Sequence, residues 1–584
     1  MSGSEGPARP DGTERPAAPG GSGAPDGSAW PGWPGSGPSR GADAGSAPSA
    51  EELFSTLGTA AHDLPAERPA DGSLERHTPA HDRTVATLAA AQAAHVAQAA
   101  RSGLLPPPPP AGPVGVLAPS RFDPVVRLAS QVVGGPAGRR VASATGFWRA
   151  ASVLVLFVAF TMSFALVERQ HCRLEGWSSP DQFFHMCYSD VPVLYGSADL
   201  GGADAPGLVD AVAADGALGQ PPLLGALLWL VAQVVPDGAS PTAPRVFFDL
   251  SAALLAAALA VAVTCVAAVA GRRRWDAAHL ALSPVVVAAG LVSYDLFAVA
   301  LGCAALLAWS RTKIVTAGVL LGLAVAVRPT YAVLAVVLLA VGLRAGRLGS
   351  AAVTTLAAAG TYVGLRAVLL PGYTGQLWTA FTTWRDGTPG YGSLWLAPQM
   401  LAQSKPQRAR FWYSGEGLGA TSSTVLAILG FGIVCMVVVT LALTLHRRPR
   451  VAHLALVAVA GCLLVSKSVP VQASLLLLPL VAWAGLRWRD HLVWATTECV
   501  YFVAVWLYIG GLTNSDRGMP AGMYLILMLV RLAGIGWLVV QTVRAARDPL
   551  RDVVRLPEDG GPGADDPLGG PVADVPDALV VRLV

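Results

Sequence analysis

Long apolar runs, separated by short segments that carry Arg or Lys, dominate the sequence from residue 148 onward. A run of about 20 apolar residues crosses the hydrocarbon core of a bilayer as a helix. The pattern therefore predicts an all-α polytopic membrane protein. About twelve transmembrane helices are expected, at 148–167, 246–270, 277–292, 296–309, 315–327, 330–343, 348–370, 421–445, 451–465, 471–486, 492–511 and 520–541.

The placement of arginines decides how one further apolar run, 221–235, is interpreted. Arg139 and Arg140 precede the first helix, and basic residues collect on the cytoplasmic side of a membrane, so the N-terminus is expected inside. If 221–235 and 246–270 both crossed, the arginines at 272–274 would face outward. We therefore expect 221–235 to form an interfacial helix in the outer leaflet, and both termini to be cytoplasmic.

Two long polar segments then lie outside the membrane, at 168–243 and 371–420. The first is acidic, with nine Asp or Glu residues against two arginines. The chain accordingly divides into a disordered Pro/Gly/Ala-rich cytoplasmic tail (1–140), a transmembrane domain (141–547) and a cytoplasmic C-terminal tail (548–584).

Composition supports this class and excludes others. Apolar residues make up 53% of the 584 residues and charged residues only 14%, against roughly a quarter in soluble proteins. The formal net charge of +3 is too small to indicate a nucleic-acid partner. The expected location is the cell membrane, with the polar chemistry on the extracytoplasmic side.

Charged residues also occur where short predicted helices meet. Several helices have only about 13–16 residues, short for a bilayer core of about 30 Å, and Asp295, Arg328 and Lys467 lie between them. Charges near membrane depth are costly and usually functional. The alternative is that these side chains reach the interface and have no function.

The first outer segment contains the cysteine pair Cys172 and Cys187, for which a disulfide is plausible outside the cell. Two unrelated thiols are the alternative. His171 and His185 share this segment with acids but lack the spacing of metal ligands, so no metal site is expected. Binding of a divalent cation is left open.

Several short motifs carry a resemblance to a known superfamily. They are Cys187-Tyr-Ser-Asp190 with Tyr195, Gln220-Pro-Pro-Leu223, Ser293-Tyr294-Asp295-Leu296, Gly390-Tyr-Gly-Ser393-Leu-Trp395, Ser466-Lys467 and Trp488-Arg489-Asp490. With this arrangement the chain resembles the GT-C membrane glycosyltransferases. Within them it is most similar to glycosyltransferase family 87, the actinobacterial polyprenyl-phosphate-mannose-dependent mannosyltransferase type.

The resemblance implies a GT-C-like helix arrangement and transfer of a sugar from a polyprenyl-phosphate donor to an extracytoplasmic glycolipid or polysaccharide. It implies an acidic residue in the first outer segment, and Asp190 is the candidate base. Candidate ligands of the donor phosphate are Arg328, Lys467 and Arg385. Residues expected to position the acceptor are Asp295, Tyr195 and Tyr294.

Departures from the family pattern leave alternatives open. Ser293-Tyr294-Asp295 stands where such proteins more often have Asn-Trp-Asp. Many of them carry a lysine and a Tyr-Pro pair where this chain has Arg328-Pro-Thr-Tyr331. The segment Ser468–Ala473 stands in place of a Tyr-Ser-Pro-Gln-Tyr-like run. A divergent substrate site and a catalytically lapsed protein both fit these departures. A twelve-helix secondary transporter is the competing class. No P-loop or dinucleotide fingerprint indicates a nucleotide-sugar donor, and no cofactor is expected.

Overall fold

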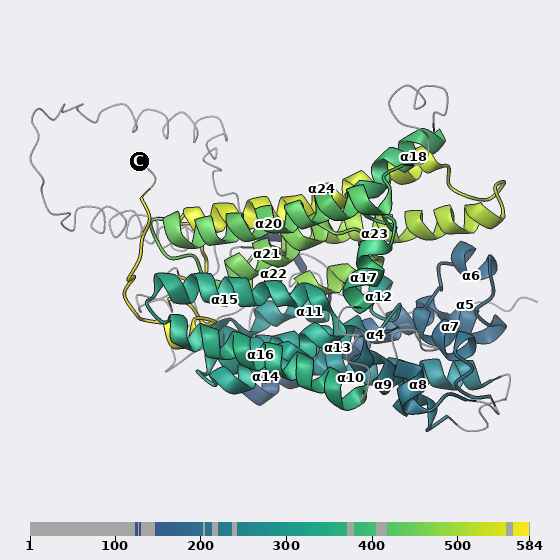
Figure 1. The fold of residues 1–584 in the computed structure, drawn as a ribbon, viewed down its shortest axis with the longest axis horizontal. Coiled ribbons are helices and arrows are strands. Elements are labelled where there is room, and N and C mark those ends of the chain that lie inside the picture. The colour runs from purple at the N-terminus through teal and green to yellow at the C-terminus, as the bar shows by residue number, and fades with distance from the viewer. Residues whose placement is uncertain are drawn as a thin grey trace, which may run out of the picture. The chain divides into compact units, whose positions relative to one another are not determined.

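Apolar helices account for most of the computed structural model (Figure 1). The structure describes residues 123–126, 128–129, 147–202, 205–212, 220–235, 242–370, 379–404, 417–555 and 565–582. Among these residues there is no β-strand. The expected disordered tail, 1–140, lies almost wholly outside the described residues.

Six helices are long and apolar enough to cross a bilayer. They are α4 (Phe147–Glu168), α10 (Ala243–Ala270), α16 (Leu348–Leu369), α20 (Ala420–Thr444), α23 (Trp488–Thr513) and α24 (Ala521–Arg547). Helix α10 continues through η1 (Gly271–Ala277) into α11 (Ala278–Ala281). These lengths and compositions mark the chain as a multi-pass membrane protein.

Shorter apolar helices pack with the long ones. They are α9 (Pro222–Ala232), α13 (Asp295–Ser310), α14 (Ile314–Val327), η2 (Pro329–Ala332) with α15 (Val333–Arg344), α21 (Val451–Val465), and η5 (Val471–Leu477) with α22 (Leu478–Ala484). The 11 residues of α9 rise roughly 16 Å, about half of a bilayer core. That length fits an interfacial helix better than a crossing one.

The expected count of twelve crossing helices is not confirmed. The predicted helix at 277–292 is interrupted, because α11 ends at Ala281 and α12 (Pro284–Ala289) begins after Ser283. Pro284 has no N–H to continue a helix from α11, and the Ser283 hydroxyl instead accepts a hydrogen bond from Val285 N at 3.3 Å. The apolar run at 277–292 is therefore divided between two helices and does not form a single crossing helix.

The remaining short helices lie in the segments between or after the helices described above. They are α5 (Gln170–Glu175), α6 (Asp181–Phe184), α7 (Asp190–Ser197), α8 (Leu208–Val212), α17 (Thr379–Asp386), η4 (Leu394–Leu396), α18 (Ala397–Ser404) and η6 (Gly570–Val572). Helices α5 to α9 gather at one end of the helical region (Figure 1).

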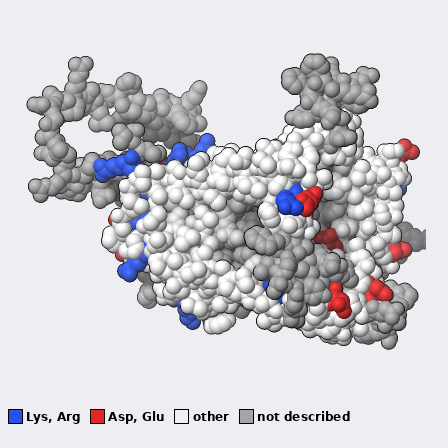
Figure 2. All heavy atoms as spheres, in the orientation of Figure 1, with Lys and Arg blue, Asp and Glu red and all other residues white. Residues whose placement is uncertain are grey.

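Charge is separated between the two ends of the helices. On the face drawn in Figure 2, Lys and Arg lie mainly at the end where the chain terminates, and acidic groups lie mainly toward the end that carries α5 to α8. The long polar segment 168–243 thus has the acidic character that the sequence indicated.

The C-terminal residues 565–582 pack on the arginine-rich end of the helices. Arg344, fully buried at the end of α15, donates to Asp577 Oδ2 at 2.7 Å, and its carbonyl accepts from Ala578 N at 2.7 Å. Val581 N donates to Leu443 O of α20 at 3.0 Å. This part of the expected C-terminal tail is therefore bound to the helical domain.

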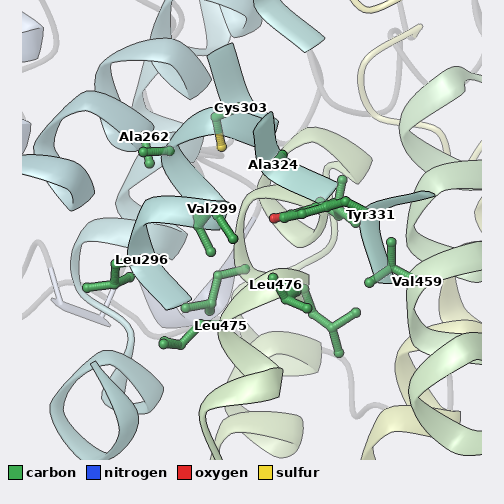
Figure 3. Packing of buried hydrophobic residues seen from close by; sticks show 14 of the residues in the cluster. Ala262, Leu296, Val299, Cys303, Ala324, Tyr331, Val459, Leu475 and Leu476 are labelled. Atoms are coloured by element: carbon green, nitrogen blue, oxygen red, sulfur yellow. The ribbon is translucent and has the colours of Figure 1, made fainter. Parts of the chain in front are cut away.

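Close packing in the interior depends on small residues. Figure 3 shows the ring of Tyr331 lying between Val299 and Val459 in the main apolar cluster. Gly318 and Gly322, one turn apart on α14, face the backbone of α16 at Thr354 and Ala358. Small residues four positions apart let membrane helices approach closely, because van der Waals packing rather than water exclusion drives their association.

Substitution of Gly322 by Ala tests this contact. A Cβ at position 322 would lie 2.8 Å from Thr361 Cβ and closer still to the Ala358 carbonyl, so the helices must separate. We expect the free energy of unfolding to fall by about 1–3 kcal/mol, as measured by thermal unfolding of the detergent-solubilised protein. Gly360→Ala is the matched control, since nothing lies within 4 Å of that position. Equal unfolding temperatures for the two variants would contradict the contact.

Candidate functional site

The start of α7 is bound to the segment that follows α12. Ser189 is the N-cap of α7, and its hydroxyl accepts from Val191 N and donates to Leu291 O at 2.7 Å. Asp190 N donates to Val292 O at 2.8 Å. These bonds bring Asp190 beside the Ser293-Tyr294-Asp295 motif, although the two lie about a hundred residues apart in sequence.

Asp295 begins α13, and its carboxylate is 2% exposed. Arg328, in extended conformation between α14 and η2, binds this carboxylate through two nitrogens. Nε contacts Oδ1 and Nη2 lies 2.7 Å from Oδ2, which is the bidentate geometry that suits a planar guanidinium. The Ser293 hydroxyl donates to Oδ2 at 3.1 Å.

Asp190 accepts two hydrogen bonds of its own. Tyr188 Oη donates to Oδ1 at 2.8 Å, and Gln472 Nε2 of η5 lies 3.4 Å from Oδ2. Burial raises the pKa of the Asp190 carboxyl and the nearby Asp295 raises it further, while Tyr188 and Arg328 oppose the rise. The result is a carboxylate that takes up a proton more readily than a solvated aspartate.

Together these residues form a polar cluster inside an apolar helical protein, which we call the Asp190 cluster. It consists of Tyr188, Asp190, Ser293, Asp295, Arg328 and Gln472. Two carboxylates face one guanidinium, whose side chain is 32% exposed. Nη1 of Arg328 makes no hydrogen bond to the described residues.

The backbone beside Gln472 is fixed by a second buried ion pair. Arg531 of α24 is fully buried and donates to Glu498 Oε2 of α23 at 2.8 Å. Its other nitrogens donate to the carbonyls of Val469 and Pro470 and to the Ser474 hydroxyl. Arg531 thus positions the start of η5, from which Gln472 reaches Asp190.

Lys467, one candidate ligand of a donor phosphate, has a different environment. Its ammonium donates to the carbonyls of Trp384 and Arg385, both at 3.0 Å, and to Thr424 Oγ1 at 2.8 Å. These three bonds match the three donors of an ammonium group. The structure thus uses Lys467 to connect α17 and α20, and does not bring it to Asp190.

The other candidates also lie outside the Asp190 cluster. Arg385 is half exposed and pairs with its neighbour Asp386, with Nε 2.8 Å from Oδ1. Tyr195 is buried against Phe247, at 4.7 Å between ring centroids. Tyr294 is buried with its hydroxyl hydrogen bonded to Ser251.

Cys172 and Cys187, the expected pair, are joined by a disulfide with 5.8 Å between their Cα atoms. Sequence reasoning missed Tyr188, Gln472, Arg531 and Glu498. Arg531 and Glu498 carried a usable signal, because both are charges inside the predicted helices at 520–541 and 492–511. Gln472 carried none, since an amide near an apolar run is common.

The structure also brings together three side chains that the sequence spacing did not indicate as a group. The structure brings His171, Asp181 and His185 together, with one ligand atom from each within 4.8 Å of the others. The spacing in the sequence did not indicate this, because the disulfide brings the two ends of the segment into contact.

The fold and the Asp190 cluster define a multi-pass helical membrane protein with a buried polar site. Comparison with protein-family models, with curated proteins and with solved structures finds no match to this chain.

The environment of Lys467 generates a prediction. Lys467→Ala should lower stability by about 1–3 kcal/mol, because it removes the ammonium that donates to the Trp384 and Arg385 carbonyls, and only the Arg385 carbonyl keeps a second donor, Thr424 Oγ1. Thermal unfolding in detergent measures this, with the exposed Lys313→Ala as control. If Lys467→Ala instead unfolds at the temperature of the control, its ammonium does not connect α17 and α20.

Proposed function

We propose that this protein is an integral-membrane glycosyltransferase of the GT-C type. It moves a sugar, with mannose as the first candidate, from a polyprenyl-phosphate donor to a glycolipid or polysaccharide acceptor on the extracytoplasmic side. The observation that carries the proposal is the Asp190 cluster, in which a partly buried carboxylate with a raised pKa lies near a partly exposed guanidinium. The family motifs quoted above add the donor class.

An inverting transfer needs a base and a cation, and the cluster offers both. Asp190 takes the proton of the acceptor hydroxyl while the acceptor oxygen bonds to the anomeric carbon of the sugar. The bond from that carbon to the phosphate oxygen breaks, and the lipid phosphate leaves with the electron pair. The negative charge on the phosphate faces Arg328, which Asp295 orients through two hydrogen bonds.

Of the three cations considered for the donor phosphate, Arg328 is therefore the one assigned here. Lys467 already donates to three oxygens, and Arg385 pairs with Asp386. The Asp190 carboxylate accepts from Tyr188 and Gln472, and its remaining lone pairs are enough for an acceptor hydroxyl.

Replacing the base gives the first test. Asp190→Asn should reduce kcat by at least about 100-fold in membranes supplied with labelled polyprenyl-phosphate-mannose, because the amide takes no proton. Asp210→Asn is the matched control, since Asp210 is an exposed aspartate of the same outer segment. Full transfer by an Asp190→Asn protein present at the normal level would overturn the assignment of the base.

The pH profile gives a second test. The base acts when ionised, so activity is lost as pH falls through the pKa of Asp190, which burial raises. The acid limb of kcat/KM should therefore lie above the usual range of an aspartate. Asp295→Asn removes the neighbouring negative charge, which lowers the pKa of Asp190 and moves this limb to lower pH. A limb that moves to higher pH would contradict this arrangement of charges.

A secondary transporter is the second candidate, because an ion pair between apolar helices is also typical of substrate pathways. Purified protein in liposomes separates the two functions. Transfer of labelled sugar to an acceptor supports the transferase. Solute uptake driven by a proton gradient, with no consumption of the lipid-linked donor, would show that the protein is a transporter and not a transferase.

A further inference from the structure

Three potential metal ligands meet on the outer segment, away from the Asp190 cluster. His171 lies on α5, Asp181 begins α6, and His185 follows α6. His171 Nε2 lies 2.6 Å from Asp181 Oδ2, and His185 Nδ1 lies 3.1 Å from Oδ1 of the same carboxylate. The two imidazole rings stack at 3.6 Å between centroids.

Covalent and backbone bonds fix the segment that carries these side chains. Cys172, next to His171, is joined to Cys187, two residues after His185. Inside this loop, Cys187 N donates to Gln182 O at 3.0 Å, and Trp177 Nε1 donates to Cys187 O at 3.2 Å. The disulfide and these bonds keep α5 and α6 adjacent whether or not an ion is bound.

The identity of the ligands indicates the class of metal. Imidazole nitrogens suit Zn²⁺ and neighbouring transition metals, whereas Ca²⁺ and Mg²⁺ prefer sites made of oxygens. Two histidines and one carboxylate are a known Zn²⁺ set, with water in the fourth position. The side chains are 35%, 43% and 45% exposed, so solvent has access to a fourth position.

The distances also suit a shared ion. Bonds of 2.0–2.2 Å in a tetrahedral site place ligand atoms roughly 3.4 Å apart. The three ligand atoms already lie within 4.8 Å of one another. The exposed His185 and the half-exposed His171 and Asp181 reach that spacing through rotation of their side chains.

We propose that His171, Asp181 and His185 form a Zn²⁺ site on the outer segment. The bound ion joins α5 to α6 alongside the disulfide. Phe183 of α6 stacks on Tyr188 at 5.3 Å between centroids, and Tyr188 donates to Asp190. The metal therefore stabilises the segment from which Asp190 enters its cluster, whatever reaction that cluster performs.

Zinc binding by the full-length protein tests the site. The protein is purified in detergent with an affinity tag free of histidine, stripped with EDTA and dialysed against Zn²⁺, and the bound metal is measured by mass spectrometry. We expect one Zn²⁺ per chain that excess Mg²⁺ does not displace. His171→Ala/His185→Ala should weaken binding by at least about 10-fold, and Asp181→Asn should weaken it in the same direction.

Glu175→Gln is the matched control, because Glu175 is an exposed acid at the end of α5 outside the ligand set. An intact disulfide and a single species on size exclusion establish that each variant is folded. Tetrahedral Co²⁺ bands in visible absorption, present in the control and lost in the double histidine variant, support the ligand set. Equal Zn²⁺ uptake by the double variant and the control, or no uptake by the unaltered protein, would overturn the proposal.

Discussion

The bidentate contact between Arg328 and Asp295 is the interaction on which the polar site depends. A charge placed between apolar helices is costly unless a partner compensates it with good geometry. Here Asp295 has little exposure, and two guanidinium nitrogens bind its carboxylate. Because this pair forms where α13 begins and α14 ends, it fixes those two helix ends relative to each other. The charge of Arg328 also opposes the rise in the pKa of Asp190.

A second buried ion pair supports the backbone beside Gln472, another member of the same cluster. Arg531 and Glu498 connect α24 to α23 at a point where both helices are otherwise apolar. The remaining donors of Arg531 bind carbonyls at the start of η5, a stretch of 3-10 helix whose backbone needs such partners in an apolar setting. Arg531 thus fixes an irregular backbone and Arg328 fixes the buried carboxylate of Asp295.

Much of this arrangement was accessible from the sequence, for identifiable physical reasons. Apolar runs predicted helices because a bilayer allows few other structures, and the motifs at Asp190 and Asp295 indicated two segments that do come together. The count of helices was less accessible, since Ser283 and Pro284 interrupt a run that stays apolar overall. From the sequence, Arg328 and Lys467 were equally good candidates for binding the donor phosphate. Their roles differ only because backbone carbonyls, which no motif reveals, surround the Lys467 ammonium.

The packing of residues 565–582 has a practical consequence for handling this protein. Asp577 and the backbone at Ala578 and Val581 bind the ends of α15 and α20, and Arg448 donates to Val575 O at 3.0 Å. A reporter or affinity tag inserted next to residues 565–582 therefore lies close to the ends of α15 and α20. A fusion there disturbs the contacts at the ends of two helices. More than a hundred residues of chain separate a fusion at Met1 from α4. The N-terminus is the better place for a label.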